Sequence, residues 1–559
     1  MFSVGTLVMA FLATAVYFAL HLTEITTRMR YIDDVTPAAK FFAAATVLLV
    51  LEITRRTTGW ALVIVASTLI LYAFFGDMLP RAVKHTGFTF DVIVEHLFLL
   101  NEGVYGIPIG VATSTLFGFI MFGAFLERSK MSSIFMDLAC LLTRNSQGGP
   151  AKVAIFASAL FGTISGSAAA NVYGTGTFTI PLMKKVGYTP HFAGAVEAVA
   201  STGGQMMPPI MGAAAFIMAD VIGVSYLTIA KAALIPSVLY YLTLLAIIHL
   251  EAVSKNMGTL PPELVPSAAS VLRRLYYLFP LVFLITILLM GRSVIACAYY
   301  GTVCIVILSM IRSETRFTFK RLCGALELSA KNAMMVSSCC ACAGIIIGVI
   351  SLTGIGYKFI NVITALAGSN LLLLMAMLMV TCIILGMGVP TAPAYIIVAT
   401  LGAPALMKAG VPIIAAHMFV YFYAILSVIT PPVCLAAFAG AAIAETNAMK
   451  TGVTAMKLGI VAFIIPFMFV FEPALLMQGS TTEIATAFAS ALIGVIGIAS
   501  GMQNWLLVRC RLWERALLLA SGLMLIFPGL ITDTIGLSSL LIVLFAQRLR
   551  KGGSPVAAA

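Results

Sequence analysis

Long apolar stretches, separated by short polar loops, run along almost the whole chain. In the first hundred residues they cover 2–20, 41–53, 60–75 and, more weakly, 91–100. A helix that crosses a bilayer needs about 20 apolar residues. By this measure the chain holds roughly 15 to 17 spanning or re-entrant segments. The pattern predicts an all-α polytopic membrane protein.

Polar interruptions divide the chain into five parts. The clearest is the hydrophilic connector EAVSKNMGTLPPELVPSAASVLRR, which separates two long apolar halves. The predicted division is a small four-helix membrane region at 1–101, a first transporter repeat at 102–250, the connector at 251–274, a second repeat at 275–478, and C-terminal membrane segments with a polar tail at 479–559.

One pattern occurs in both halves of the chain, and a single constant shift in residue number relates the two copies. The first copy contains TISGSAAAN, PLMKKVG and STGGQMMPP, and the second contains GMGVPTAPA, PALMKAG and SVITPP. The shift superimposes Pro181 on Pro404 and Pro208 on Pro431. Interrupted apolar segments at matching positions are typical of secondary transporters, which bind substrate near the bilayer midplane between inverted repeats. The repetition predicts such a transporter.

Each copy begins with two short apolar arms around a tip of small or polar residues. The arms that flank Ser165–Ser167 have about 15 residues each, roughly 22 Å, which is shorter than the ~30 Å hydrocarbon core. Leu371–Leu385 and Thr391–Met407 flank Gly386–Pro390 in the same manner. Two re-entrant hairpins are therefore predicted. Helix N-termini at the tips suit an anion such as a carboxylate, and unpaired carbonyl groups there would equally suit a cation.

Downstream of each hairpin, two consecutive prolines interrupt a helix. Thr202–Gln205 leads into Pro208 and Pro209, and Ser427–Thr430 leads into Pro431 and its neighbour. A proline removes a backbone donor and clashes with the preceding turn, so each helix is predicted to break there. Glycine and proline also kink ordinary packed membrane helices. Four interrupted elements in two matched pairs favour a functional role.

Two ionisable residues of the repeated segments, Glu197 and His417, lie within apolar stretches rather than in loops. Glu197 is about one and a half turns before the first break, and His417 lies in the corresponding stretch of the second half. A charged carboxylate in lipid costs several kcal/mol, so it is paired, protonated or functional. Glu197 is a candidate for proton coupling or a hydrogen-bonded structural acid. His417 is predicted to contact a neighbouring helix.

Composition and charge agree with a membrane location. Hydrophobic residues make up 61% of the chain and charged residues 10%, so there are too few polar groups to cover a soluble surface. The net charge of +12 is scattered over short loops, as expected of a polytopic protein that is oriented by its loop charges. A nucleic-acid partner is therefore not expected.

The sequence does not carry the usual signatures of enzymes. It contains no HExxH motif, no GxSxG elbow with partners and no Walker motif. Cys339, Cys340 and Cys342 lie in an apolar helix without further zinc ligands nearby, and are expected to pack against other helices. We expect no catalytic residues, no cofactor and no metal beyond a transported sodium ion. An intramembrane enzyme and a passive anion channel are the alternatives, and a channel rarely needs two broken-helix repeats.

Three long motifs carry a resemblance to a known family. EGVYGIPIGVATSTLFGFIMFGAFLERS (102–129), GGPAKVAIFASALFGTISGSAAAN (148–171) and AGAVEAVASTGGQMMPPIMGAAAFIMAD (193–220) resemble the fused permease of tripartite ATP-independent periplasmic (TRAP) transporters, most closely the branch that works with TAXI-type binding proteins. The resemblance implies a small membrane subunit fused to a large one in the bacterial cytoplasmic (inner) membrane. It further implies elevator-type uptake of a small organic anion, delivered by a periplasmic TAXI-type binding protein and driven by Na⁺ or H⁺.

The resemblance also implies which residues bind substrate and ions. One region would comprise Ser165, Gly166, Ser167, Asn171, Thr202, Gly203, Gly204 and Pro208, and the other Gly388, Pro390, Thr391, Ser427, Thr430 and Pro431. The second tip has GVPT where the first has SGSA, which puts an equivalent second ion site in doubt. The segment FPGLITDTIGL (527–537) resembles an addition found in some of these permeases.

Overall fold

The computed structural model describes residues 4–80, 83–526 and 529–552, so Phe527 and Pro528 of the FPGLITDTIGL segment lie outside the described residues. The described chain is helical throughout, with one isolated bridge between Trp505 and Arg509 in place of any strand. This confirms the predicted all-α class. Seven described helices are long and apolar enough to span a membrane, or up to nine if two bent pairs are counted as spans. Shorter apolar helices account for the larger number predicted.

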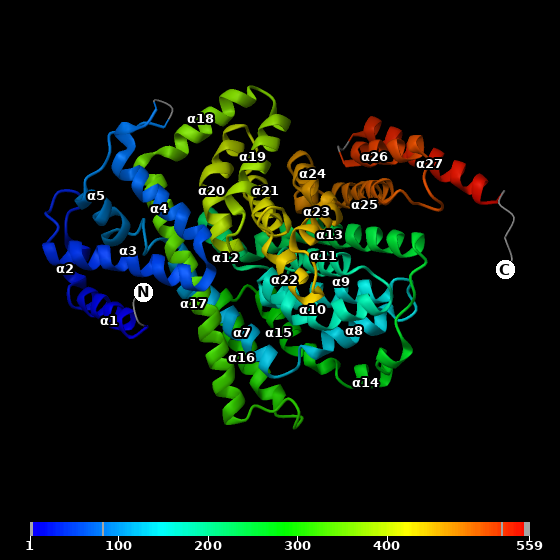
Figure 1. Ribbon diagram of the computed structural model, residues 1–559, viewed down its shortest axis with the longest axis horizontal. Coiled ribbons are helices and arrows are strands. Elements are labelled where there is room, and N and C mark those ends of the chain that lie inside the picture. The colour runs from blue at the N-terminus through cyan, green and yellow to red at the C-terminus, as the bar shows by residue number, and fades with distance from the viewer. Residues whose placement is uncertain (1–3, 81–82, 527–528, 553–559) are drawn as a thin grey trace.

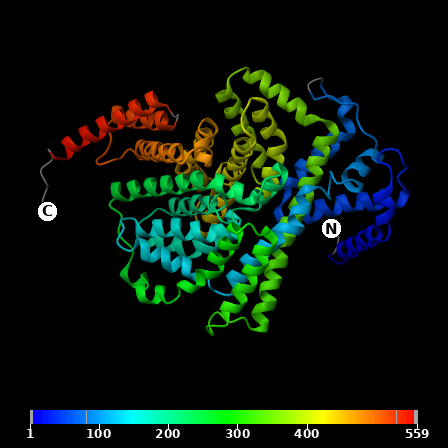
Figure 2. The same ribbon diagram turned by 180° about the vertical axis from the view of Figure 1, so that it is seen from behind.

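The N-terminal region packs mainly against one long helix of the second half. Its helices are α1 (Val4–Leu20), α2 (Leu22–Thr27), α3 (Pro37–Thr58), α4 (Trp60–Phe75), α5 (Phe90–Val94) and the π-helical η2 (Glu95–Leu99). Both α3 and α4 contact α17 (Phe319–Thr353). Thr54 donates to the Ser338 carbonyl oxygen at 3.1 Å. Figures 1 and 2 show this region at one end of the molecule.

The central body covers the segments of the two predicted repeats. The first comprises α6 (Ile107–Val111), the π-helical η3 (Ala112–Leu116), α7 (Phe117–Arg128), α8 (Ser133–Thr143), α9 (Gly149–Ser165), α10 (Ala168–Lys185), α11 (Pro190–Gly203), α12 (Ala213–Ile222) and α13 (Tyr226–Ser254). The connector and the start of the second half hold α14 (Ala268–Leu272), α15 (Phe279–Leu289), α16 (Val294–Ser309) and α17. After these come α18 (Ile355–Ala367), α19 (Leu371–Gly386), α20 (Thr391–Lys408), α21 (Ile413–Leu426), α22 (Leu435–Ala444), α23 (Ala448–Leu458) and α24 (Ile465–Phe471).

The helix boundaries follow the constant shift that relates the two halves of the sequence. α10 maps onto α20, and α11 maps onto α21, with the same first and last positions. The pattern of helix starts, proline breaks and turns thus recurs in the fold. The inverted orientation of the repeats and the depth of the tips in a bilayer stay predictions.

Local chemistry explains both hairpin tips. Gly166 ends α9 with a left-handed backbone (φ +63°), and the Ser167 side chain caps α10 by accepting from the Ala170 amide at 3.4 Å. In the second hairpin Gly388 has φ +73°, and Pro390 is the last residue before α20. Glycine tolerates a positive φ at no steric cost, so the chain reverses direction at the tip of each hairpin.

A C-terminal unit extends from the end of the molecule opposite the N-terminal region (Figures 1 and 2). It consists of α25 (Thr481–Gln503), α26 (Leu512–Ile526) and α27 (Leu530–Gly552). α25 packs against α26 and also against α13, which attaches the unit to the central body.

Candidate functional site

The two hairpin tips meet through one side chain, that of Gln205. Its Nε2 donates to the Gly166 carbonyl oxygen at 2.9 Å, and its Oε1 accepts from Thr391 Oγ1 at 3.0 Å. Tyr421 on α21 donates to the Gln205 carbonyl oxygen at 2.6 Å. The two predicted regions are therefore adjacent in space. Sequence reasoning did not assign a role to Gln205, although its place between two glycines and two prolines in the first break was a usable signal.

The first break packs tightly against the first hairpin. A Cβ on Gly162 would lie 2.5 Å from the Gly204 Cα, so only glycines permit this approach of the two backbones. Thr202 is buried and bonds the Ala198 carbonyl oxygen at 2.7 Å, and Gly203 packs against Tyr240. Beyond the break, Pro208 joins Pro209 through a cis peptide.

The second break contacts its own hairpin by a hydroxyl group. Ser427 Oγ donates to the Gly386 carbonyl oxygen at 3.0 Å, and Thr430 Oγ1 bonds the Leu426 carbonyl oxygen at 2.8 Å. Gly388 packs against Val433, and Pro431 joins Pro432 through a cis peptide.

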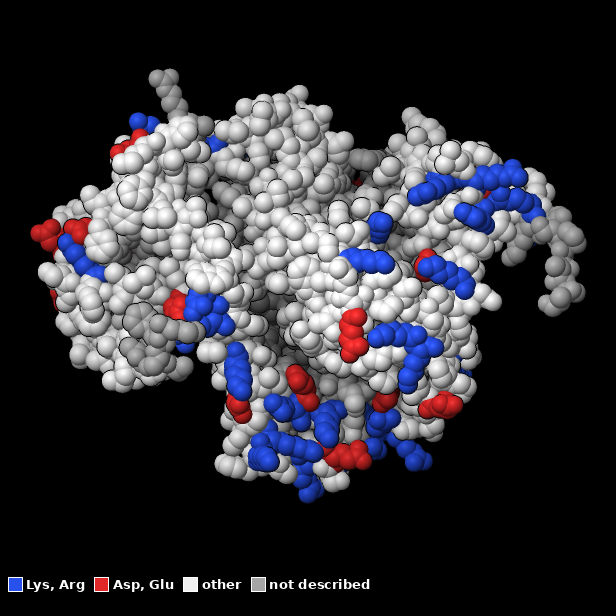
Figure 3. Space-filling model, viewed as in Figure 1, with Lys and Arg blue, Asp and Glu red and all other residues white. Residues whose placement is uncertain are grey.

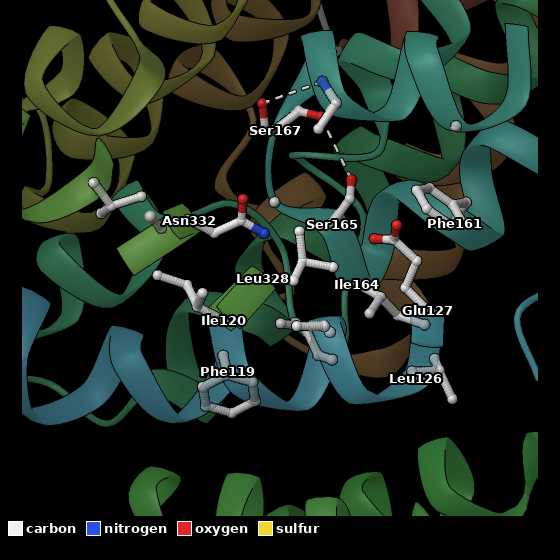
Figure 4. A pocket seen from close by; sticks show the side chains of 18 of the residues that line it. Phe119, Ile120, Leu126, Glu127, Phe161, Ile164, Ser165, Ser167, Leu328 and Asn332 are labelled. Atoms are coloured by element: carbon white, nitrogen blue, oxygen red, sulfur yellow. Dashed lines mark hydrogen bonds between the residues drawn. The ribbon is translucent and has the colours of Figure 1, made fainter. Parts of the chain in front are cut away.

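A cavity of about 430 Å³ opens at the first tip. Ser165, Gly166 and Ser167 line it, whereas none of the other predicted site residues does. The opposite walls come from α7 and α17, which contribute Glu127 and Asn332. Figure 4 shows the two tip serines with the Glu127 carboxylate and the Asn332 amide on either side of Ser165 in that view.

The charges of this cavity limit what it can bind. Among the described residues that line it, Glu127 is the one charged residue, and none is a Lys or Arg. An anion in the cavity would therefore be held by hydroxyl groups and by the amides at the N-terminus of α10, where the helix dipole favours negative charge. Glu127 and Asn332 offer acceptors to a donor group elsewhere on the same ligand.

Glu197 lies behind the first tip in a cage of hydroxyl groups. It is 0% exposed. Ser158 donates to Oε1 at 2.7 Å, Thr175 at 2.5 Å and Ser201 at 3.2 Å, while Thr179 donates to Oε2. Within the described residues no Lys, Arg or His pairs with this carboxyl group. The four hydroxyl donors were not predicted, although Thr175 and Thr179 follow the predicted Asn171 at helical spacing.

The cage can satisfy either protonation state of the carboxyl group. Thr175 can turn to the Asn171 carbonyl oxygen at 2.8 Å, and Thr179 to the Thr175 carbonyl oxygen at 3.1 Å. A hydroxyl group that bonds its own helix leaves a lone pair free to accept from a protonated acid. Because each threonine has both partners within reach, neither state leaves a buried group unpaired.

Asn171 connects this cage to the tip. Its Nδ2 donates to the Ser158 carbonyl oxygen at 2.9 Å and to the Ser201 carbonyl oxygen at 3.4 Å. Its Oδ1 accepts from Thr175 Oγ1 at 3.4 Å. A rotation of the Thr175 hydroxyl group therefore changes a contact of Asn171, whose side chain bonds both the first hairpin and the helix before the first break.

His417 occupies a different environment in the second half. Its Nδ1 lies 2.8 Å from the phenolic oxygen of Tyr395, so the two rings join α21 to α20. Both side chains line a second cavity of about 420 Å³, which is walled mostly by apolar groups of α6, α12, α17 and α20.

The family model described as "Tripartite ATP-independent periplasmic transporter, DctM component" matches residues 45–484. The chain belongs to this family. A second family model, "Domain of unknown function (DUF3394)", matches residues 484–538, which includes most of α25 and all of α26. Membership of the TRAP permease family, together with the apolar helices, makes the chain a multi-pass protein of the bacterial inner membrane.

The curated relatives that carry a functional name are TRAP permeases, which are transporters rather than enzymes. Identity is 29% over 143 residues with the C4-dicarboxylate TRAP transporter large permease protein DctM of Pseudomonas aeruginosa, covering 26% of this chain and 33% of that protein. It is 36% over 91 residues with the isethionate TRAP transporter permease protein DctMQ of Oleidesulfovibrio alaskensis, covering 16% and 14%. It is 23% over 360 residues with the sialic acid TRAP transporter permease protein SiaT of Haemophilus influenzae, covering 62% and 55%. The matches thus span only part of each relative.

Proposed function

We propose that this chain takes up a small organic anion, a carboxylate, across the inner membrane by ion-driven secondary transport. The cavity at the first hairpin tip carries the proposal. It combines the N-terminus of an 18-residue helix, the two tip serines and a wall that, among the described residues, holds Glu127 and no basic side chain. A carboxylate held by amides and hydroxyl groups is released more readily than one paired with a buried arginine, as a transport site requires.

We further propose that a periplasmic binding protein of the TAXI type delivers the substrate. The support is family membership and the three motifs that resemble that branch. Movement would be of the elevator type. The cavity lies between the hairpin tip and a wall formed by α7 and α17, so a shift of the hairpin along that wall would carry the site from one membrane face to the other.

For the coupling ion, the Glu197 cage favours a proton over sodium. Its oxygens already touch one another through hydrogen bonds of 2.5–3.2 Å, an arrangement that leaves no room for a cation between them. Its hydroxyl groups have partners for both states of the acid. Sodium, coordinated by tip hydroxyl and carbonyl oxygens, is the alternative.

Uptake by the purified full chain in liposomes tests the proposal. The first probes are the radiolabelled solutes named for the relatives, a C4-dicarboxylate, isethionate and sialic acid, each with and without a TAXI-type binding protein. We expect accumulation above the outside concentration only with that protein and with an imposed pH gradient. Equilibration without accumulation would indicate the passive channel, and accumulation driven by a sodium gradient alone would exclude proton coupling.

A further inference from the structure

The C-terminal unit carries opposite charges at its two ends. α25 has 23 residues, roughly 34 Å at the usual helical rise, which is enough to cross the ~30 Å hydrocarbon core. Residues 531–550 of α27 form a second helix of spanning length. The ends of this helix pair therefore lie at the two membrane surfaces, where charged side chains meet headgroups and water.

Acidic residues gather at the end where α25 and α27 begin. Glu472, Glu483 and Asp533 line one small cavity of about 130 Å³. Glu483 accepts from the Ser480 amide at 2.8 Å and so caps α25, while Asp533 accepts from Ser490 Oγ at 2.8 Å. The carboxylates at this end thus stabilise the helix starts.

Arginines gather at the other end, where α25 and α27 finish and α26 begins. They are Arg509, Arg511, Arg515, Arg548 and Arg550. Figure 3 shows basic side chains along the outer part of this flank. Because loops rich in Lys and Arg face the cytoplasm in polytopic proteins, this basic end is assigned to the cytoplasmic surface and the acidic end to the periplasmic one.

Of the described residues at the basic end, one is a carboxylate, Glu514, and it is turned inward. Glu514 is 2% exposed and accepts from the Arg511 amide at 2.7 Å, from Gln547 Nε2 at 3.0 Å and from Arg550 Nη2 at 3.0 Å. Gln547 Oε1 in turn accepts from the Leu507 and Val508 amides at 3.0 and 3.2 Å. This network fixes the loop between α25 and α26 on the last turns of α27.

Fixing the loop leaves three arginines, Arg509, Arg511 and Arg548, on the exposed surface. Large apolar side chains are exposed beside them: Leu512 is 86% exposed, Leu549 64% and Trp513 43%. Tryptophan is enriched at the membrane interface, where its ring lies at headgroup level. A free phosphate or a nucleic acid would leave this apolar rim in water, whereas a phospholipid covers it with acyl chain and meets the arginines with its phosphate.

We propose that the basic end of the C-terminal unit binds the headgroups of anionic phospholipids in the cytoplasmic leaflet. The C-terminal unit, most of which matches a domain of unknown function, thereby anchors the central body to the bilayer through the contact of α25 with α13. The cytoplasmic leaflet carries the anionic lipids that attract such basic segments. Lipid binding at this end requires neither a particular substrate nor a particular coupling ion.

Lipid retention by the full chain tests the proposal. The protein is exchanged into nanodiscs of phosphatidylethanolamine with phosphatidylglycerol, and the lipid that stays bound after detergent extraction is identified by native mass spectrometry. We expect retained phosphatidylglycerol, and about a hundredfold less in the triple variant Arg509→Gln, Arg511→Gln, Arg548→Gln. The matched control changes three exposed lysines elsewhere, Lys185→Gln, Lys450→Gln and Lys457→Gln, and should retain the lipid.

Further arms make the result decisive. The triple arginine-to-lysine variant keeps the charge and should restore retention, which excludes misfolding as the cause of loss. High salt should weaken retention, because the attraction is screened. Equal retention by the glutamine variant, equal loss in the lysine control, or displacement of the lipid by millimolar inorganic phosphate would each overturn the proposal.

Discussion

Helices α10 and α11 have the same boundaries as α20 and α21, but the interiors of the two repeats differ. Behind the first tip, Glu197 is surrounded by Ser158, Thr175, Thr179 and Ser201, with Asn171 at the edge. At the constant shift between the halves, the corresponding positions hold Val420, Thr381, Val398, Gly402, Ala424 and Ala394. Of these six positions in the second repeat, one, Thr381, holds a polar residue. The first interior is a hydrogen-bonded network and the second is an apolar core.

This difference shows that the hairpin fold does not need the polar cage. In the second repeat Val420 packs so closely on Gly402 that a Cβ there would meet it at 2.9 Å, and the result is an ordinary core contact. A buried acid with four hydroxyl groups is costlier than apolar packing whenever one partner is lost. We infer that the first repeat retains the cage for ion coupling rather than for stability.

The strongest test of the contrast removes the acid and keeps its shape. Glu197→Gln is expected to abolish pH-driven uptake, since the amide cannot take up and release a proton. Exchange of substrate across liposomes without any gradient should continue, because the tip cavity does not include Glu197. Both rates are measured on the same preparation of liposomes.

His417→Gln is the matched control, because it changes a buried ionisable residue of the second repeat. It should leave the pH dependence of uptake in place. Sodium-driven uptake that is indifferent to Glu197→Gln would contradict proton coupling and leave the carboxylate with a structural role.

A second test concerns the close backbone contact of the first repeat. Gly162→Ala places a Cβ 2.5 Å from a backbone atom of Gly204, whereas Gly386→Ala places one 2.7 Å from the Ser427 hydroxyl oxygen. The Ser427 hydroxyl group can turn away, but its Cβ, at 2.9 Å, stays in place, so this contact is relieved by a smaller shift than the 2.5 Å contact with the Gly204 Cα. Gly162→Ala should therefore destabilise the protein by about 1–3 kcal/mol, and Gly386→Ala by less. Thermal unfolding in detergent measures both, and equal losses would refute the difference.

A third test separates the bridging amide from its counterpart. Gln205→Ala removes both bonds that join the tips, while Val428, at the corresponding position, makes no such bridge. We expect Gln205→Ala to lower stability by about 1–3 kcal/mol, the usual cost of unpaired buried groups, and to slow uptake. Val428→Ala should leave the rate of uptake nearly unchanged. Comparable slowing by the two variants would show that the bridge has no particular role.

Much of the framework could be predicted from sequence because its signals are local. The paired prolines, the tip glycines and the constant shift between the halves are visible in the chain, and helix boundaries followed them within the repeats. Glu197 was recognisable because an acid is rare in an apolar segment. The TAXI assignment, the coupling ion and the binding roles of the predicted site residues stay predictions.

The partners of Glu197 and the bridge of Gln205 could not be predicted in the same way. The cage joins α9, α10 and α11, and the bridge joins residues 166, 205 and 391, so both depend on how distant segments pack. Serine and threonine are common in membrane helices, where their hydroxyl groups usually bond the preceding turn. Only the packing shows which hydroxyl groups face the acid.

The smallest effect is expected from a substitution that makes one cage position identical to its counterpart in the second repeat. Ser201→Ala removes the most distant donor to Glu197, at 3.2 Å, and reproduces the alanine found at 424. One hydrogen bond to a charged group contributes roughly 1.5–3 kcal/mol at good geometry, and this long contact contributes less. Losing it disfavours the ionised carboxylate, so the proton is held more tightly and uptake should extend to higher pH, by less than about one unit, since one unit corresponds to 1.36 kcal/mol. Uptake measured across a series of external pH values detects the shift. A move toward lower pH would mean that Ser201 supports the protonated acid, and the assignment of the donors around Glu197 would have to be reversed.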